Sequence, residues 1–221
     1  MALEVEMKAH IGDPEAIGRR LRAAGFVAAG KIDKDDRYFR SANGVEFRVR
    51  FRGTNGGDSR RPRTDARESA GDARGPMPGA PASASAREPA SRPAPGAGES
   101  RPPSSAVVTH KRKQIREGVE RNLEWEFEVS DASAFEALCE RMGCERFAVK
   151  RKRGSVFRRG SLFAEVVEVE RLGWFVEIEC MVEGGDGEHA AGQIRDTLEA
   201  IGVDARDVES RSYLQLLGFE R

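Results

Sequence analysis

The chain has 221 residues, 38% of them hydrophobic, which suffices for one large domain or two small ones with a buried core. Lysine plus arginine and aspartate plus glutamate both number 37, so no net charge favours nucleic acid or a membrane surface as a partner. The three cysteines have no CxxC spacing, and we find neither a secretory signal nor an apolar run that would span a bilayer. We therefore expect a cytoplasmic protein with no nucleic-acid or membrane partner.

The first predicted strand is LEVEMK, residues 3–8, whose polar face carries Glu4, Glu6 and Lys8. A helix follows, with Asp13 as its cap, Pro14 in the opening turn and Gly25 at its end. Its expected apolar stripe comprises Ile17, Leu21 and Ala24.

Residues 53–105 interrupt this pattern with glycine, proline, alanine, serine and arginine and almost nothing apolar. Such a segment buries too little surface to offset its ordering entropy. Both flanks carry the same strand pattern, so we predict a single domain over 1–221 with a disordered low-complexity insertion at about 53–105.

The strand–helix pattern recurs after the insertion, in LEWEFEVSDASAFEALCERMGCERF. Ser130 or Asp131 caps the second helix, Gly143 ends it, and its expected stripe comprises Phe135, Leu138 and Met142. A third helix is predicted over about 188–200, before Gly202, with a stripe of Ile194, Leu198 and Ile201.

Charge on the predicted strands is sorted by strand. The first, fifth and last strands carry carboxylates, and FRVR and THKRK carry cations; the carboxylates are Glu4, Glu6, Glu124, Glu126, Glu177 and Glu179. A single strand ordinarily turns its charged face to water. Solubility does not require sorting, however, and the helices need an apolar sheet surface to pack on. We therefore predict an α+β fold, a closed antiparallel β-barrel of about eight strands with a charged interior tunnel and helices packed outside.

The charges expected in this interior indicate which ligands it binds, because buried charges are costly unless they are paired or bound to metal. Inward-facing guanidinium and ammonium groups match phosphate oxygens. Clustered carboxylates favour a hard divalent cation, Mg²⁺ or Mn²⁺. A triphosphate together with a metal ion satisfies both sets of charges.

Several motifs together resemble the CYTH superfamily, the triphosphate tunnel metalloenzymes. EVEMK resembles the ExExK signature, DRYF at Asp36 resembles DxYF, FRVR resembles LRxR, and LGWFVEIE resembles LGxFxEIE. The terminal RSYLQLLGF, with Arg211, Ser212 and Tyr213, is similar to the end of class IV adenylate cyclases. The resemblance covers the chain apart from the insertion.

The resemblance implies roles for particular residues. The implied triphosphate-binding residues are Lys8, Arg48, Arg50, Lys111, Arg151 and Arg153. The implied metal ligands are Glu4, Glu6, Glu177 and Glu179, together with Glu126, and the implied catalytic residues are Lys8, Lys111 and Glu126.

Two positions depart from the family pattern or leave it open. Val167 stands where the family usually has an aspartate, so either Glu165 on the same strand face replaces that ligand or the ligand is missing. In the basic strand, Arg151 and Arg153 match the family spacing, although Lys150 and Lys152 form an equally basic face.

The resemblance implies a class IV-type adenylate cyclase that converts ATP to cyclic AMP and pyrophosphate with Mg²⁺ or Mn²⁺, and a homodimer. The alternative is a triphosphatase that hydrolyses inorganic, thiamine or nucleoside triphosphate. A second alternative is a non-catalytic module that binds polyphosphate or a nucleotide.

Overall fold

Alternation of apolar and charged residues produces nine strands in the part of the chain that the computed structural model describes, residues 3–51, 105–116, 118–182 and 187–219. All of these residues belong to one compact unit. The predicted insertion, apart from Ser105, lies outside the described residues. The strands are β1 Leu3–His10, β2 Val27–Arg40, β3 Glu46–Phe51, β4 Ala106–Arg116, β5 Val119–Val129, β6 Glu145–Arg159, β7 Leu162–Val169, β8 Gly173–Val182 and the short β9 Val208–Glu209.

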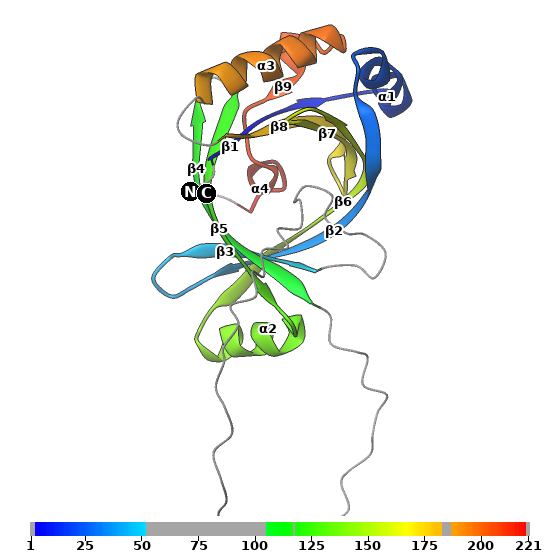
Figure 1. Cartoon of the computed structure of the whole chain (residues 1–221). Helices are drawn as coiled ribbons and strands as arrows, with labels where there is room; N and C mark the ends of the chain where they lie inside the picture. Colours follow the sequence, from blue (N-terminus) through cyan, green and yellow to red (C-terminus); the bar gives the residue numbers. More distant parts are fainter. Residues whose placement is uncertain (1–2, 52–104, 117, 183–186, 220–221) are drawn as a thin grey trace, which may run out of the picture. The chain divides into compact units, whose positions relative to one another are not determined.

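Eight of the strands close into an antiparallel barrel, as predicted (Figure 1). The order is β5-β4-β3-β2-β6-β7-β8-β1, and β1 closes the ring by pairing with β5 from Leu3 to Glu6. Strand β9 pairs with β1 further along, at Lys8 and Ala9. The three carboxylate-bearing strands β8, β1 and β5 are therefore neighbours, and the cation-bearing β3 and β4 are neighbours elsewhere in the ring.

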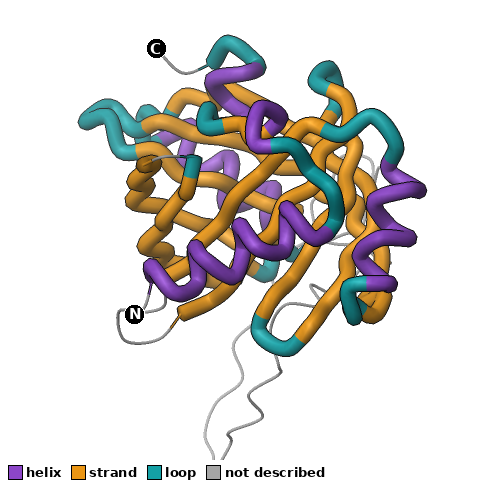
Figure 2. The backbone as a smooth tube through the Cα atoms, turned by 90° about the horizontal axis from the view of Figure 1, so that it is seen from above, coloured by secondary structure: helices purple, strands orange, loops and turns teal. Residues whose placement is uncertain are grey.

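The three predicted helices pack on the outside of the barrel (Figure 2). Asp13 caps α1 Pro14–Ala23 by accepting a hydrogen bond from the Ala16 N–H at 2.9 Å. Asp131 accepts the equivalent bond from Ala134 and caps α2 Ala132–Arg141, which decides between Ser130 and Asp131. The third helix, α3, spans Gly187–Ala200, and two short elements follow, the 3₁₀ helix η1 Ala205–Asp207 and α4 Tyr213–Leu216.

Apolar side chains on the outer face of the barrel form two clusters under the helices. The larger cluster joins the outward residues of β1, β7 and β8 to α1 and α3, and it includes Val5, Ala164, Ile178, Leu21 and Ile194. The second lies under α2 and includes Phe39, Val49, Val108, Ala132 and Cys139. This arrangement leaves the opposite face of each strand to line the interior, where the charged side chains adjoin a third apolar cluster that includes Ile32, Val167 and Phe175.

The expected stripe on α2 is wrong in part. Leu138 and Met142 are 51% and 61% exposed, whereas Ala132 and Cys139 are buried and Phe135 is partly buried. The helix has turned its small residues toward the barrel, because β2 and β3 already supply the large side chains of Phe39, Phe47 and Phe51 there. The stripes on α1 and α3 are confirmed, since Ile17, Leu21, Ile194, Leu198 and Ile201 are all buried.

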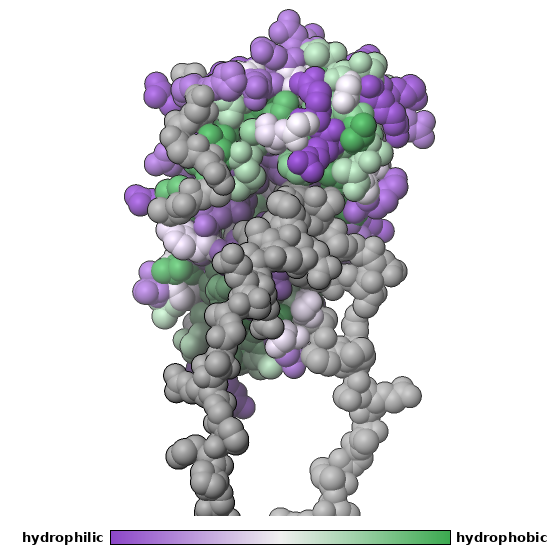
Figure 3. Space-filling view, in the orientation of Figure 1, coloured by the Kyte–Doolittle hydropathy of each residue, from purple (hydrophilic) through white to green (hydrophobic). Residues whose placement is uncertain are grey.

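The outer surface mixes hydrophilic and hydrophobic residues, as the view in Figure 3 shows for one face. Trp125 and Phe127 on β5 are about half exposed, at 46% and 55%. Among the described residues, no helix combines the length and the apolar character needed to cross a membrane.

Two leucines on different helices test the outer packing. Leu21 on α1 is fully buried, so Leu21→Ala should lower the free energy of unfolding by about 2–5 kcal/mol. Leu138→Ala on α2 removes the same atoms from an exposed position and should change it by no more than about 0.5 kcal/mol. Urea unfolding followed by circular dichroism measures both values. Equal losses in the two variants would contradict the assigned packing of α1.

Candidate functional site

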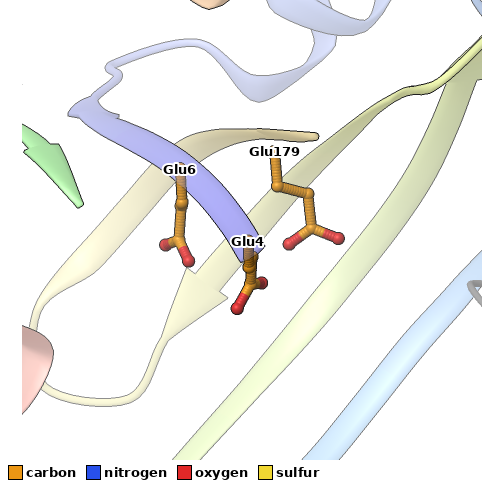
Figure 4. A group of neighbouring side chains, drawn as sticks. All are labelled: Glu4, Glu6 and Glu179. Carbon is orange, nitrogen blue, oxygen red and sulfur yellow. The ribbon is translucent and has the colours of Figure 1, made fainter. Parts of the chain in front are cut away.

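Three carboxylates meet inside the barrel. Ligand oxygens of Glu4, Glu6 and Glu179 all lie within 4.8 Å of one another. Glu4 and Glu6 leave the same side of β1 because they are two residues apart, and the register places Glu6 opposite Glu179 on β8 (Figure 4). Three converging oxygen ligands form a donor set that suits Mg²⁺ or Mn²⁺.

The electrostatics of this cluster also favour a cation. Burial, followed by repulsion from Glu120, Glu177 and Glu4, raises the pKa of Glu6 to about 7. Burial and then the hydrogen-bonded Glu4 raise the pKa of Glu124 to about 7. A divalent cation would relieve this repulsion, so the residues present fit the metal that the resemblance implies.

Lys111 bridges the acidic cluster and β5. Its Nζ lies 2.7 Å from Glu4 Oε2, and it also forms an ion pair with Glu124. Burial alone would lower the pKa of Lys111, but the carboxylates of Glu4 and Glu124 outweigh it and raise this pKa above its ordinary value. Lys111 is therefore a fixed cation in direct contact with a candidate metal ligand.

Cations on β3 and β6 surround a second carboxylate, Asp36 of β2. Asp36 is fully buried and accepts two hydrogen bonds from the Arg50 guanidinium, at 2.6 and 3.0 Å. Lys150 Nζ lies 3.2 Å from the same carboxylate. Burial would raise the pKa of Asp36, but Arg50 and Lys150 together hold it well below its usual range. The aspartate of the DRYF motif thus positions cations inside the barrel.

Arg48 and Glu126, also predicted site residues, meet between β3 and β5. The guanidinium donates to Thr109 Oγ1 at 2.8 Å, and the Thr109 hydroxyl donates to Glu126 Oε1 at 2.8 Å. Arg48 and Glu126 are themselves 3.5 Å apart. Glu126 is therefore placed among the cations of β3 and β4, and it does not belong to the three-carboxylate group.

The preference for Arg151 and Arg153 as inward-facing residues is wrong. Both are exposed on the outer face, where Arg151 pairs with Asp35 and Glu170. Lys150 and Lys152 are buried at 8% and 4% exposure and face the interior. The register of β6 against β2 decides this, since Lys150 pairs with Asp36 and thereby shares its inward face.

Lys152 on β6 lies between two carboxylates, one on β7 and one on β8. Its Nζ is 2.7 Å from Glu165 Oε2 and 2.6 Å from Glu177 Oε2. Lys34 reaches Glu165 from the other side at 2.9 Å. Glu165 and Glu177 are consequently engaged by lysines and lie outside the group of three close carboxylates, although Glu177 is a predicted metal ligand. Of the five implied ligands, Glu4, Glu6 and Glu179 converge.

Val167, which stands where the family usually has an aspartate, is fully buried in an apolar cluster with Phe175, Val169 and Tyr213. Glu165 shares its inward face but points its carboxylate at Lys34 and Lys152. The described residues thus provide no acidic side chain at the position of Val167, and Glu165 does not join the close carboxylates in its place.

The C-terminal RSY segment reaches the interior through α4, which lies within the ring of strands in Figure 1. Ser212 caps α4, and the buried Tyr213 donates its hydroxyl to Glu177 Oε1 at 2.8 Å. The Tyr213 ring packs edge-on against Phe175, and Lys8 and Lys150 lie 5.5 and 5.3 Å from its centroid. The Tyr213 side chain thus lines the site.

Sequence reasoning missed several interior residues, among them Lys34, Glu120 and Asn122. Glu120 forms ion pairs with Lys8 at 3.7 Å and Lys113 at 3.2 Å. It lies four residues before Glu124 on β5 and so faces the same side of the strand, and the alternating pattern, extended toward the start of the strand, would have predicted it. Lys34 lies in KIDKDD, which is charged on both faces, and nothing in this pattern indicates which face is inward.

No protein-family model and no curated protein matches the sequence. Solved structures do match. The PH1012 protein of Pyrococcus horikoshii is 22% identical, with 96% of this chain and 98% of that chain covered and a TM-score of 0.67. A protein of Vibrio parahaemolyticus described as a "putative adenylate cyclase" is 13% identical, with 98% of each chain covered and a TM-score of 0.62.

A third similar structure is HpAC1 from Hippeastrum, a "putative adenylyl cyclase" described as revealing a dominant triphosphatase activity. It is 16% identical, with 99% of this chain and 95% of that chain covered and a TM-score of 0.56. These likenesses establish a shared fold. They confirm the barrel fold that the resemblance to the CYTH superfamily implies.

The raised pKa values predict how metal-free stability depends on pH. An acid whose folded-state pKa is raised contributes stability at low pH that is lost as the pH rises from its ordinary value of 4.5 through about 7. In EDTA, Tm should therefore fall across this window, and Mg²⁺ should raise Tm more at pH 8 than at pH 5. Glu6→Gln should flatten both dependences; an unchanged pH profile in this variant would contradict the assigned repulsion.

Because the lysines face inward and the arginines outward, only the lysines should contribute to anion binding. Lys150→Met removes a cation from the interior while Arg50 still pairs with Asp36, so the affinity for inorganic tripolyphosphate should fall about 10-fold or more. Arg151→Met is the matched control on the outer face and should bind as the unmodified protein does. Isothermal titration calorimetry measures both, and a larger loss in Arg151→Met would reverse the assignment of the two faces.

Proposed function

We propose that this protein is a metal-dependent enzyme that acts on a triphosphate inside its barrel. The observation that carries the proposal is the close group formed by Glu4, Glu6 and Glu179, which shares one interior with fixed lysines and arginines. In a metal-bound triphosphate, the metal would pair with the carboxylates and the phosphate oxygens with the lysines and arginines.

Glu4, Glu6 and Glu179 would hold Mg²⁺ or Mn²⁺. When bound, the metal would lower the pKa of an attacking hydroxyl group and neutralise phosphate charge. Lys8, Arg48, Arg50 and Lys111 would bind phosphate oxygens, as the resemblance implies, and Lys150 and Lys152 replace the two arginines in this role. Because these cations are already fixed by carboxylates, they would stabilise charge that develops on a leaving phosphate without rearranging.

We favour the cyclase reaction, in which the ribose 3′-oxygen of ATP attacks the α-phosphorus. The 3′ hydroxyl loses its proton, the bond from the α-phosphorus to the bridging oxygen breaks, and pyrophosphate leaves with cyclic AMP as the other product. The supporting observation is Tyr213, which belongs to the terminal segment similar to class IV cyclases and contacts Glu177 inside the barrel.

The second candidate is a triphosphatase, in which water attacks the γ-phosphorus and orthophosphate leaves. The triphosphatase activity described for the Hippeastrum protein of the same fold favours it. The third candidate, a binding module without turnover, rests on Val167 at the position of the family aspartate.

One assay separates the three candidates. The purified chain is incubated with ATP and either Mg²⁺ or Mn²⁺, and the products are separated by ion-exchange chromatography. Cyclic AMP with pyrophosphate supports the cyclase, orthophosphate supports the triphosphatase, and saturable binding without product supports the module. Absence of both binding and turnover with ATP, tripolyphosphate and thiamine triphosphate would contradict all three.

Two interior variants test the site itself. Glu6→Gln removes one candidate metal ligand and Lys111→Met removes the cation next to Glu4, so each should lower the metal-dependent rate about 100-fold or more. Glu168→Gln, at an exposed position on β7, is the matched control and should retain the rate. Circular dichroism verifies folding. Unchanged rates in both interior variants would remove these residues from the site.

A further inference from the structure

All four α-helices end in the same backbone motif. In each, the N–H of the second residue after the cap donates to the carbonyl three residues before the cap, and a glycine with positive φ lies between. These bonds are Phe26 to Leu21, Cys144 to Cys139, Val203 to Leu198 and Phe219 to Leu214, at 3.0, 2.9, 3.0 and 2.8 Å. The glycines are Gly25, Gly143, Gly202 and Gly218, with φ between 71° and 86°.

This motif brings two side chains together at the helix end, and the contact is ordinarily hydrophobic. In α1, α3 and α4 the pair consists of large apolar residues, Leu21 with Phe26, Leu198 with Val203 and Leu214 with Phe219. In α2 the same two positions are Cys139 and Cys144. The motif therefore places two thiols where the other helices place an apolar contact.

The environment of the two sulfurs agrees with this placement. Cys139 is fully buried in the cluster under α2, and the partly buried Cys144 packs against the same cluster. Burial raises the pKa of the Cys139 thiol to about 11, and the next cause is the neighbouring Cys144. The two thiols are thus close to each other, and only one of them is accessible.

We propose that Cys139 and Cys144 form a reversible oxidation site, which a low-molecular-weight disulfide such as oxidised glutathione converts to an intramolecular disulfide. The partly exposed Cys144 reacts first and the buried Cys139 resolves the intermediate. This inference concerns the outside of the barrel and is independent of the proposed function.

The chemistry takes two exchange steps. The Cys144 thiolate attacks one sulfur of oxidised glutathione, the glutathione disulfide bond breaks, and one glutathione thiolate leaves. The Cys139 thiolate then attacks the Cys144 sulfur and releases the second glutathione. The two protons lost by the cysteines end on the two glutathione thiols, so two cysteines are oxidised while one glutathione disulfide is reduced.

The third cysteine provides an internal control. Cys180 lies on β8 in the cluster under α1 and α3, whereas Cys139 and Cys144 belong to the cluster under α2. Figure 1 shows α2 on the opposite side of the barrel from α3. Cys180 should therefore stay reduced.

The test treats the reduced full-length protein with oxidised glutathione, denatures it, alkylates the free thiols and maps the peptides by mass spectrometry. We expect one alkylated cysteine, Cys180, and a cross-link between Cys139 and Cys144 that lowers the mass of the intact chain by two hydrogen atoms. Tm should rise on oxidation, because the cross-link restrains the unfolded chain, and dithiothreitol should reverse the shift.

Two variants separate the roles of the sulfurs. Cys139→Ala should stop at a glutathione adduct on Cys144, and Cys144→Ala should leave Cys139 reduced and give no cross-link. Circular dichroism before oxidation verifies that both are folded, and Cys180→Ala should behave as the unmodified chain does. A stable glutathione adduct on Cys144 of the unmodified chain, a disulfide between two chains, or three free cysteines would each overturn the proposal.

Discussion

The pairing of buried charges inside the barrel is the constraint on which the rest of the structure depends. An unpaired buried ion is strongly destabilising, by about 3–5 kcal/mol when one partner is removed. Lys152 therefore lies between Glu165 and Glu177, and Asp36 is shared by Arg50 and Lys150. These contacts join neighbouring strands across the interior, so the closed ring and the charge pattern support each other. Where carboxylates instead meet one another, at Glu4, Glu6 and Glu179, the same constraint leaves a cation as the missing partner.

The elements and their inward or outward faces were largely predictable, because several independent signals agree on them. Asp13 followed by Pro14 begins a helix, and Gly25 ends it with a positive φ of 86°. The sorting of charge by strand indicated a charged interior, but the sequence did not show which strands would lie side by side in the ring. Strands β8, β1 and β5 are adjacent in the ring, so carboxylates that are distant in the chain line a common wall. Closure of β1 onto β5 creates this wall, and no local pattern encodes that pairing.

Prediction failed where the local pattern was symmetric. The run at 150–153 is basic on both faces, and only the pairing of Lys150 with Asp36 turns the lysines inward. The pairing of β2 with β6 has two register irregularities, at which one extra residue, Ala29 on β2 and Phe147 on β6, is left without a partner on the other strand of this pair. In α2, two stripes compete, and packing against Phe47 and Phe51 favours the one with small residues. In each case a contact distant in the sequence decided between local alternatives of similar energy.

The paired interior has a consequence for how a triphosphate would bind. Its oxygens would contact lysines and arginines that already have carboxylate partners, so binding would exchange one anion for another at cations that are held in place. The gain in electrostatic energy is then modest for each contact, but little side-chain entropy is lost, since Arg50 and Lys152 are ordered beforehand by Asp36, Glu165 and Glu177. The carboxylates that a triphosphate displaces need a new partner in turn. At Glu4, the partner of Lys111, a divalent metal held with Glu6 and Glu179 would supply one, and this would couple the two ligands: each should bind more tightly in the presence of the other, by the same factor.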